Sequence, residues 1–67
     1  MPIVNLNILE GRDQDAKRAL VKNVTNAICE SIDVPPEKVR IIINEMKNDD
    51  YAVAGTLVVD TLKDGNS

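Results

Sequence analysis

The second residue of the chain has a type and position that suggest catalysis. The sequence begins Met1-Pro2, so removal of the initiator methionine would leave Pro2 with a free secondary amine. An uncharged amine can accept a proton and return it, as a general base does. Pro2 also has a structural explanation, because proline at the first residue of a strand needs no ladder hydrogen bond. Taken alone, this residue leaves both interpretations open.

The composition excludes most other kinds of catalytic or metal site. With no histidine and one cysteine, the chain can form no Ser-His or Cys-His nucleophile pair and no Cys/His zinc site. Cys29 is expected at the edge of the polar side of a helix, as an inert thiol. Asp49 and Asp50 supply far fewer oxygens than the roughly six to eight that calcium prefers. We therefore expect no metal site.

Two arginines and one aromatic residue are the other candidates for a site. Arg12 follows a glycine and is, by itself, typical of a solvated turn. Arg40 lies among apolar residues and needs a partner wherever it faces; substrate binding or an ion pair with Glu10 or Glu45 would each satisfy it. Tyr51 is the only aromatic residue, and it could either contact substrate or pack at an interface.

Length and composition also restrict the assembly. A folded chain of this mass exposes about 4,200 Å² and buries roughly 6,500 Å². That burial barely offsets the conformational entropy of ordering 67 residues. Since one cysteine cannot form a disulfide within the chain, self-association is the remaining way to bury more surface. We expect a homo-oligomer.

Charge and hydropathy exclude other partners. The net charge is -3 and there is a single aromatic residue, so the chain lacks both the attraction to phosphate and the stacking platform that nucleic-acid binding requires. No apolar run is long enough to span a membrane, and no secretory signal precedes the domain. We expect a cytoplasmic protein that binds neither nucleic acid nor membrane.

The sequence pattern predicts elements that would hold these residues. Residues 2–9 alternate as a half-buried strand does. Asp13 is expected to cap a helix that ends near Asp33 and the prolines after it, and residues 39–46 form a second strand, apolar on both faces. The apolar stripe of the helix is predicted to contain Ala16, Leu20, Val21, Val24, Ala27, Ile28 and Ile32.

These elements indicate a single α/β (α+β) domain over residues 1–62. A strand, a helix and a second strand form a β-α-β unit with parallel strands. After the loop 47–50, residues 51–59 are expected to form a small-residue turn and another short strand, which gives a C-terminal hairpin. Residues 63–67 are expected to form a flexible tail. One helix covers only one face of this sheet.

The order of these residues resembles the 4-oxalocrotonate tautomerase family (2-hydroxymuconate tautomerases) of the tautomerase superfamily. The resemblance is carried over residues 2–56 by Pro2-Ile3, by Ile8-Leu9-Glu10-Gly11-Arg12, by Val39-Arg40-Ile41-Ile42, by Glu45-Met46 and by the turn 51–55. It implies a dimer whose four-stranded sheet is backed by two helices, and three dimers in a hexamer.

The resemblance also implies a cofactor-free isomerase that interconverts keto and enol forms of 2-hydroxymuconate or a similar 2-oxo acid. By position, Pro2 corresponds to the N-terminal proline base, and Arg12 and Arg40 to the substrate-binding arginines. Tyr51, with Leu9 and Val53, corresponds to the apolar wall. The arginines would lower the pKa of the Pro2 amine, and the Arg40 beside a given Pro2 is expected to come from another chain.

Three departures from the family pattern leave the substrate open. The turn contains Ala52-Val53-Ala54-Gly55 where the family has more glycine, Lys38 replaces a small polar residue, and Asp49 and Asp50 add negative charge beside Tyr51. The alternatives are a superfamily enzyme of dehalogenase or decarboxylase type and a non-catalytic oligomeric binding module. Retention of Met1 would favour the module.

Overall fold

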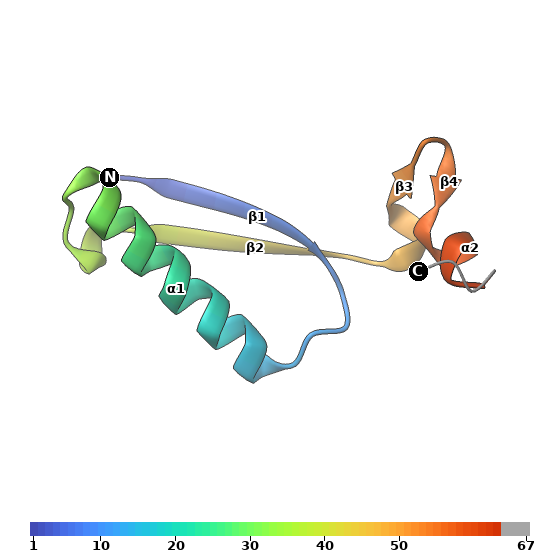
Figure 1. The fold of residues 1–67 in the computed structure, drawn as a ribbon, viewed down its shortest axis with the longest axis horizontal. Helices are drawn as coiled ribbons and strands as arrows, with labels where there is room; N and C mark the ends of the chain where they lie inside the picture. The colour runs from blue at the N-terminus through green and yellow to red at the C-terminus, as the bar shows by residue number, and fades with distance from the viewer. Residues whose placement is uncertain (64–67) are drawn as a thin grey trace.

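The chain folds around the predicted β-α-β unit. The computed structural model describes residues 1–63, which begin with strand β1 (Ile3–Leu9), helix α1 (Gln14–Ile32) and strand β2 (Arg40–Met46). A single helical turn, η1 (Pro36–Lys38), connects α1 to β2 (Figure 1). The strands pair in parallel, with Ile3 opposite Arg40 and Leu9 opposite Met46. The predicted topology is therefore confirmed.

Local side-chain and backbone interactions fix both ends of α1. Asp13 has an extended backbone, and its side chain accepts a 2.8 Å hydrogen bond from the N–H of Ala16, which satisfies one of the free donors of the first turn. At the other end Asp33 adopts a left-handed conformation, and its N–H donates to the carbonyl of Cys29. Both termini agree with the sequence prediction.

The buried face of α1 differs in part from the predicted stripe. Ala16, Ala27 and Ile32 are exposed, whereas these positions of the helix are half-buried: Lys17, Leu20, Val21, Val24, Thr25, Ile28 and Cys29. Lys17 can lie there because its Nζ atom is 2.6 Å from Oε1 of Glu45 on β2. Half-burial of Cys29 is consistent with its predicted position at the edge of the polar side.

The two faces of the sheet have very different exposure. Val4 and Leu6 on the helix-covered face are half-buried. On the opposite face Ile3 is 55% exposed and Ile42 is 49% exposed. None of residues 1–62 is fully buried, and the chain exposes 5117 Å² where a compact monomer of this mass would expose about 4,200 Å². One sheet face therefore lacks its cover in the single chain.

A small C-terminal unit follows β2 and projects beyond the sheet (Figure 1). It contains the turn η2 (Asn48–Asp50), the hairpin strands β3 (Ala52–Val53) and β4 (Thr56–Leu57), and helix α2 (Val58–Lys63). Ala54 and Gly55 both have positive φ, 54° and 83°, which is the geometry of a two-residue hairpin turn. The predicted hairpin is therefore present.

The end of the hairpin departs from the prediction. Val58 and Val59 were expected to continue the last strand, but they begin α2 instead. Lys63 closes that helix, and residues 64–67 of the expected tail lie outside the described residues. Within the described part of the chain, neither helix has the length and apolar character needed to cross a membrane.

Candidate active site

An open cleft lies where β1 and β2 end. Its volume is about 550 Å³, and it is lined by Asn7, Ile8, Leu9, Arg12, Met46 and Tyr51. We call it the Arg12 cleft. Leu9, Arg12 and Tyr51 were predicted site residues, and the fold brings these three together. Asn7, Ile8 and Met46 were not predicted from the sequence.

The parallel register and the turn after β1 build this cleft. Leu9 and Met46 are partners in the register, and the N–H of Glu10 donates a 2.8 Å hydrogen bond to the Met46 carbonyl. The chain then turns at Gly11, whose φ of 120° is one that residues with a side chain rarely adopt. The Nη1 atom of Arg12 thereby donates a 2.9 Å hydrogen bond back to the Leu9 carbonyl.

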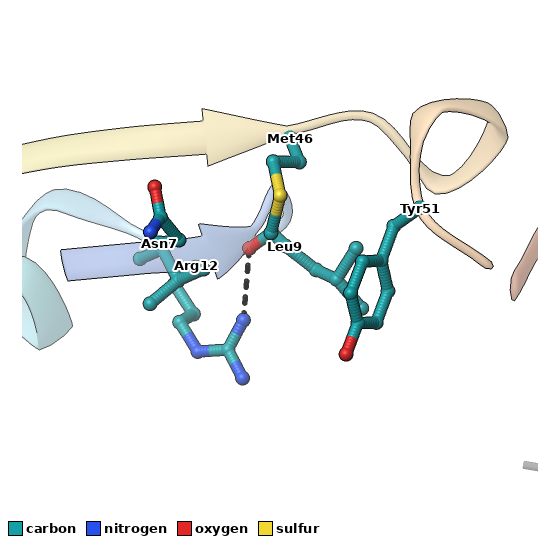
Figure 2. Close-up of a pocket in the computed structure, with 6 residues that line it drawn as sticks. Asn7, Leu9, Arg12, Met46 and Tyr51 are labelled. Atoms are coloured by element: carbon teal, nitrogen blue, oxygen red, sulfur yellow. Dashed lines mark hydrogen bonds between the residues drawn. The ribbon is translucent and has the colours of Figure 1, made fainter. Parts of the chain in front are cut away.

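Tyr51 forms the opposite wall of the Arg12 cleft. It follows η2, and its carbonyl accepts a 2.9 Å hydrogen bond from the N–H of Val58, which ties it to the start of α2. Figure 2 shows the Tyr51 phenol and the Arg12 guanidinium extending in the same direction, with the Leu9 side chain between them. A cation, an apolar floor and an aromatic wall together suit a planar anionic ligand.

Pro2 and Arg40 lie at the other end of the sheet. The backbone N–H of Arg40 donates a 3.0 Å hydrogen bond to the Pro2 carbonyl, and Nη1 of Arg40 donates a 2.6 Å hydrogen bond to the Glu37 carbonyl. We call this region the Pro2 end. At about 3.3 Å per residue, the length of β1 separates it from the Arg12 cleft by about 20 Å. Within a single chain, Pro2 and Arg40 therefore lie far from the residues of the Arg12 cleft.

The remaining predicted residues occupy separate positions. Val53 is 58% exposed in β3 and does not line the Arg12 cleft, so its predicted contact with the site is not made within one chain. Lys38 closes η1, at the Pro2 end. Asp49 and Asp50 are exposed in η2. Among the described residues, no three acidic or cysteine side chains gather as metal ligands would.

The sequence matches a family model over most of its length. The model is described as tautomerase enzyme, and it matches residues 2–61. The chain belongs to the tautomerase family. The resemblance found in the sequence is thus confirmed, and the chain is a member of an enzyme family whose reaction is an isomerisation.

Named relatives of this tautomerase cover almost its whole length. It is 48% identical over 60 residues to a probable tautomerase of Halalkalibacterium halodurans, an alignment that covers 90% of this chain and 98% of that protein. It is 45% identical over 60 residues to a 2-hydroxymuconate tautomerase of Bacillus subtilis, which covers 90% of this chain and 97% of the relative.

Solved structures of 4-oxalocrotonate tautomerases share its fold. An isozyme from Methylibium petroleiphilum superposes with a TM-score of 0.92 at 38% identity, covering 94% of this chain and 98% of that one. A subunit of a heterohexameric enzyme from Chloroflexus aurantiacus superposes with a TM-score of 0.86 at 30% identity, covering 90% and 97%. The predicted fold class of this tautomerase is therefore confirmed.

Proposed function

We propose that this tautomerase is a cofactor-free isomerase that converts 2-hydroxymuconate, or a similar enol of a 2-oxo acid, into the keto form. Pro2 is its general base once Met1 has been removed. The relative from Bacillus subtilis carries the name of this activity. Met1 is 75% exposed, so an aminopeptidase can reach it.

The observation that carries the proposal is the separation of the two half-sites. Pro2 and Arg40 lie at one end of β1, and the Arg12 cleft lies at the other. Two strands related by a two-fold axis run antiparallel when they pair side by side, so the Pro2 end of one chain meets the Arg12 cleft of its partner. One such dimer contains two complete sites.

The exposed sheet supports this assembly. β1 and β2 form a two-stranded sheet within the chain, and pairing with a second copy would give the expected four strands backed by two helices. The face that bears Ile3 and Ile42 would still be open in that dimer. Association of three dimers would cover it and give a homohexamer, a subunit number shared with the Chloroflexus aurantiacus enzyme.

The electrostatics of the joined site suit an amine base. Burial and nearby cations both disfavour a protonated amine, so Arg40 and the partner's Arg12 lower the pKa of the Pro2 amine. Because the Arg40 backbone bonds to Pro2 within one chain, we assign this Arg40 to the same chain and not, as the resemblance implied, to another. The guanidinium of Arg12 binds a carboxylate of the substrate, while Leu9 and Tyr51 contact its conjugated chain. Arg40 stabilises the negative charge that develops on the 2-oxygen.

The reaction moves one proton and needs no co-reactant. The Pro2 nitrogen takes the proton of the 2-hydroxyl, and the electron pair left on oxygen delocalises along the dienolate. The Pro2 ammonium then returns the proton to a carbon of the conjugated chain. The C–O bond becomes a carbonyl, one carbon-carbon double bond is lost, and the amine is neutral again.

The direct test is an ultraviolet assay on the processed protein. Intact mass first establishes that Met1 is absent. The absorbance of 2-hydroxymuconate should then fall at a rate proportional to protein concentration, with the keto acid as the product. A panel of enol monoacids and diacids, halogenated acrylates and 2-oxo diacids distinguishes this activity from dehalogenation and decarboxylation. Turnover of halogenated acrylates alone, or of 2-oxo diacids alone, would contradict the proposal.

A further inference from the structure

Asn7 is a polar residue of the Arg12 cleft whose role neither the sequence motifs nor the proposed reaction explains. It is exposed on the face of β1 that α1 leaves open, and it lines the cleft together with Leu9 and Arg12. Figure 2 shows Asn7 and Arg12 on the side of the cleft away from Tyr51. Its carboxamide makes no hydrogen bond to any other described residue.

The arrangement around Arg12 leaves room for a second donor. One nitrogen of the guanidinium is held by the Leu9 carbonyl at 2.9 Å, so the group is oriented in advance. Within residues 1–63 no other hydrogen bond is made by its N–H groups, which can therefore bind an anion. An ionised carboxylate has more lone pairs than one guanidinium edge satisfies. A neutral amide beside the cation can donate to it without adding a charge that needs its own partner.

We propose that Asn7 is a specificity-determining residue that donates a hydrogen bond to the carboxylate bound by Arg12. This inference rests on the proposed function for the substrate class, an enol of a 2-oxo acid. The amide N–H contacts the carboxylate at a distance from the reacting oxygen. Asn7 therefore contributes to binding of both substrate and transition state, and it selects for an anionic group at that end of the ligand.

The chain provides a matched control for this proposal. Asn5 has the same side chain on the same strand and the same face, and it is also exposed, but it does not line the Arg12 cleft. Substitution to alanine at the two positions therefore removes the same side-chain atoms. A difference in ligand binding between the two variants is therefore an effect of the Arg12 cleft, and not of any substitution on this sheet face.

Binding can be measured without turnover because the cleft contains its own probe. Tyr51 is the only aromatic residue of the chain, so intrinsic fluorescence arises from the wall of the Arg12 cleft alone. The probe ligand is adipate, a saturated dicarboxylate of the same carbon number as 2-hydroxymuconate that neither tautomerises nor absorbs near tyrosine. Its dissociation constant is obtained by fluorescence titration of the assembled, processed protein.

We expect Asn7→Ala to weaken adipate binding about tenfold, because a hydrogen bond to a charged group is lost. Asn7→Asp should weaken it about a hundredfold, because a new negative charge faces the ligand and competes for Arg12. Asn5→Ala should change it less than about twofold. Equal effects at positions 5 and 7, or unchanged binding in Asn7→Asp, would overturn the proposal.

Kinetics and sedimentation separate this role from a structural one. Where tautomerisation is measured, Asn7→Ala should raise KM with little change in kcat, because uniform binding is lost; a fall in kcat at unchanged KM would contradict the proposal. The variants should sediment as the parent does. If the parent binds adipate through Asn7 but turns over no enol, the proposed function fails while the role of Asn7 survives.

Discussion

The backbone N–H of Arg40 donates a 3.0 Å hydrogen bond to the carbonyl oxygen of Pro2. This bond joins the first residue expected in the processed chain to the start of β2, next to the register pair Ile3 and Arg40. It places the backbone of Arg40 next to the proposed base, while the Arg40 guanidinium donates to the Glu37 carbonyl at 2.6 Å. Arg12 is held at the far end of β1, by the Leu9 carbonyl, and can act on a Pro2 only in another copy.

Replacement of Pro2 tests the base directly. Pro2→Ala leaves a primary amine that lacks the ring constraint, and we expect kcat for 2-hydroxymuconate to fall at least about a hundredfold, the range expected for loss of a positioned general base. Assembly should be unchanged in sedimentation. Pro36→Ala, which changes an exposed proline in η1, serves as the control. If Pro2→Ala turned over the substrate at the parental rate, Pro2 would not be the general base.

The charge of Arg40 should set the pH dependence. The active amine is uncharged, so kcat/KM falls as the pH drops below its pKa. Arg40→Ala removes a nearby cation, which raises the pKa of the Pro2 amine and moves the acid limb of the profile to higher pH by roughly one unit. Arg40→Lys keeps the charge and should leave the limb close to its original position. If the acid limb of the kcat/KM profile did not move in Arg40→Ala, this electrostatic role of Arg40 would be excluded.

Arg12 and Arg18 form a matched pair for the binding role. Arg18 lies on α1, with a side chain 70% exposed and an ion pair to Asp15 at 2.9 Å. Exposed pairs of this kind contribute about 0–1 kcal/mol. Arg18→Ala should therefore leave KM within about twofold of the parent, whereas Arg12→Ala should raise it at least about tenfold. Similar KM values for the two variants would show that the cleft does not bind the substrate.

The exposed sheet face should be required for assembly. Ile42→Asp places a charge where the proposed homohexamer buries an isoleucine, and we expect sedimentation to show smaller species. Asn26→Asp, on an exposed position of α1, introduces the same side chain and should leave the assembly intact. A parental sedimentation coefficient for Ile42→Asp would place the interface elsewhere.

Much of the fold could be predicted because its signals are local. The alternation over residues 3–9 and the cap at Asp13 each act within a few residues, and the structure has both. The start of α2 could not be predicted in this way. Val58 and Val59 are β-branched and favour strands, but β3 begins only at Ala52, shortly after η2, so the last strand has a pairing partner over just two residues. The chain then coils into a helix beside η2.

The site could be predicted only in part, because its composition depends on register. Arg12 and Leu9 followed from the motif, whereas Met46 enters the cleft because β2 pairs with β1 so that Met46 lies opposite Leu9. The predicted parallel pairing already placed both strand ends at one edge, and the alternation placed Asn7 on the same face as Leu9. These two signals together could have identified Asn7 and Met46 from the sequence.

The most direct test of the shared site is a mixing experiment with two variants that each lack one half of the site. Pro2→Ala supplies an intact Arg12 cleft and Arg12→Ala supplies an intact Pro2. When equal amounts are denatured together and reassembled, chance pairing completes about a quarter of the sites if each site takes its two halves from different chains. We predict recovery of about a quarter of the parental kcat/KM, whereas Arg12→Ala reassembled alone should keep at most about a tenth of it and Pro2→Ala alone at most about a hundredth. No recovery in mixed oligomers, verified by mass, would contradict the account.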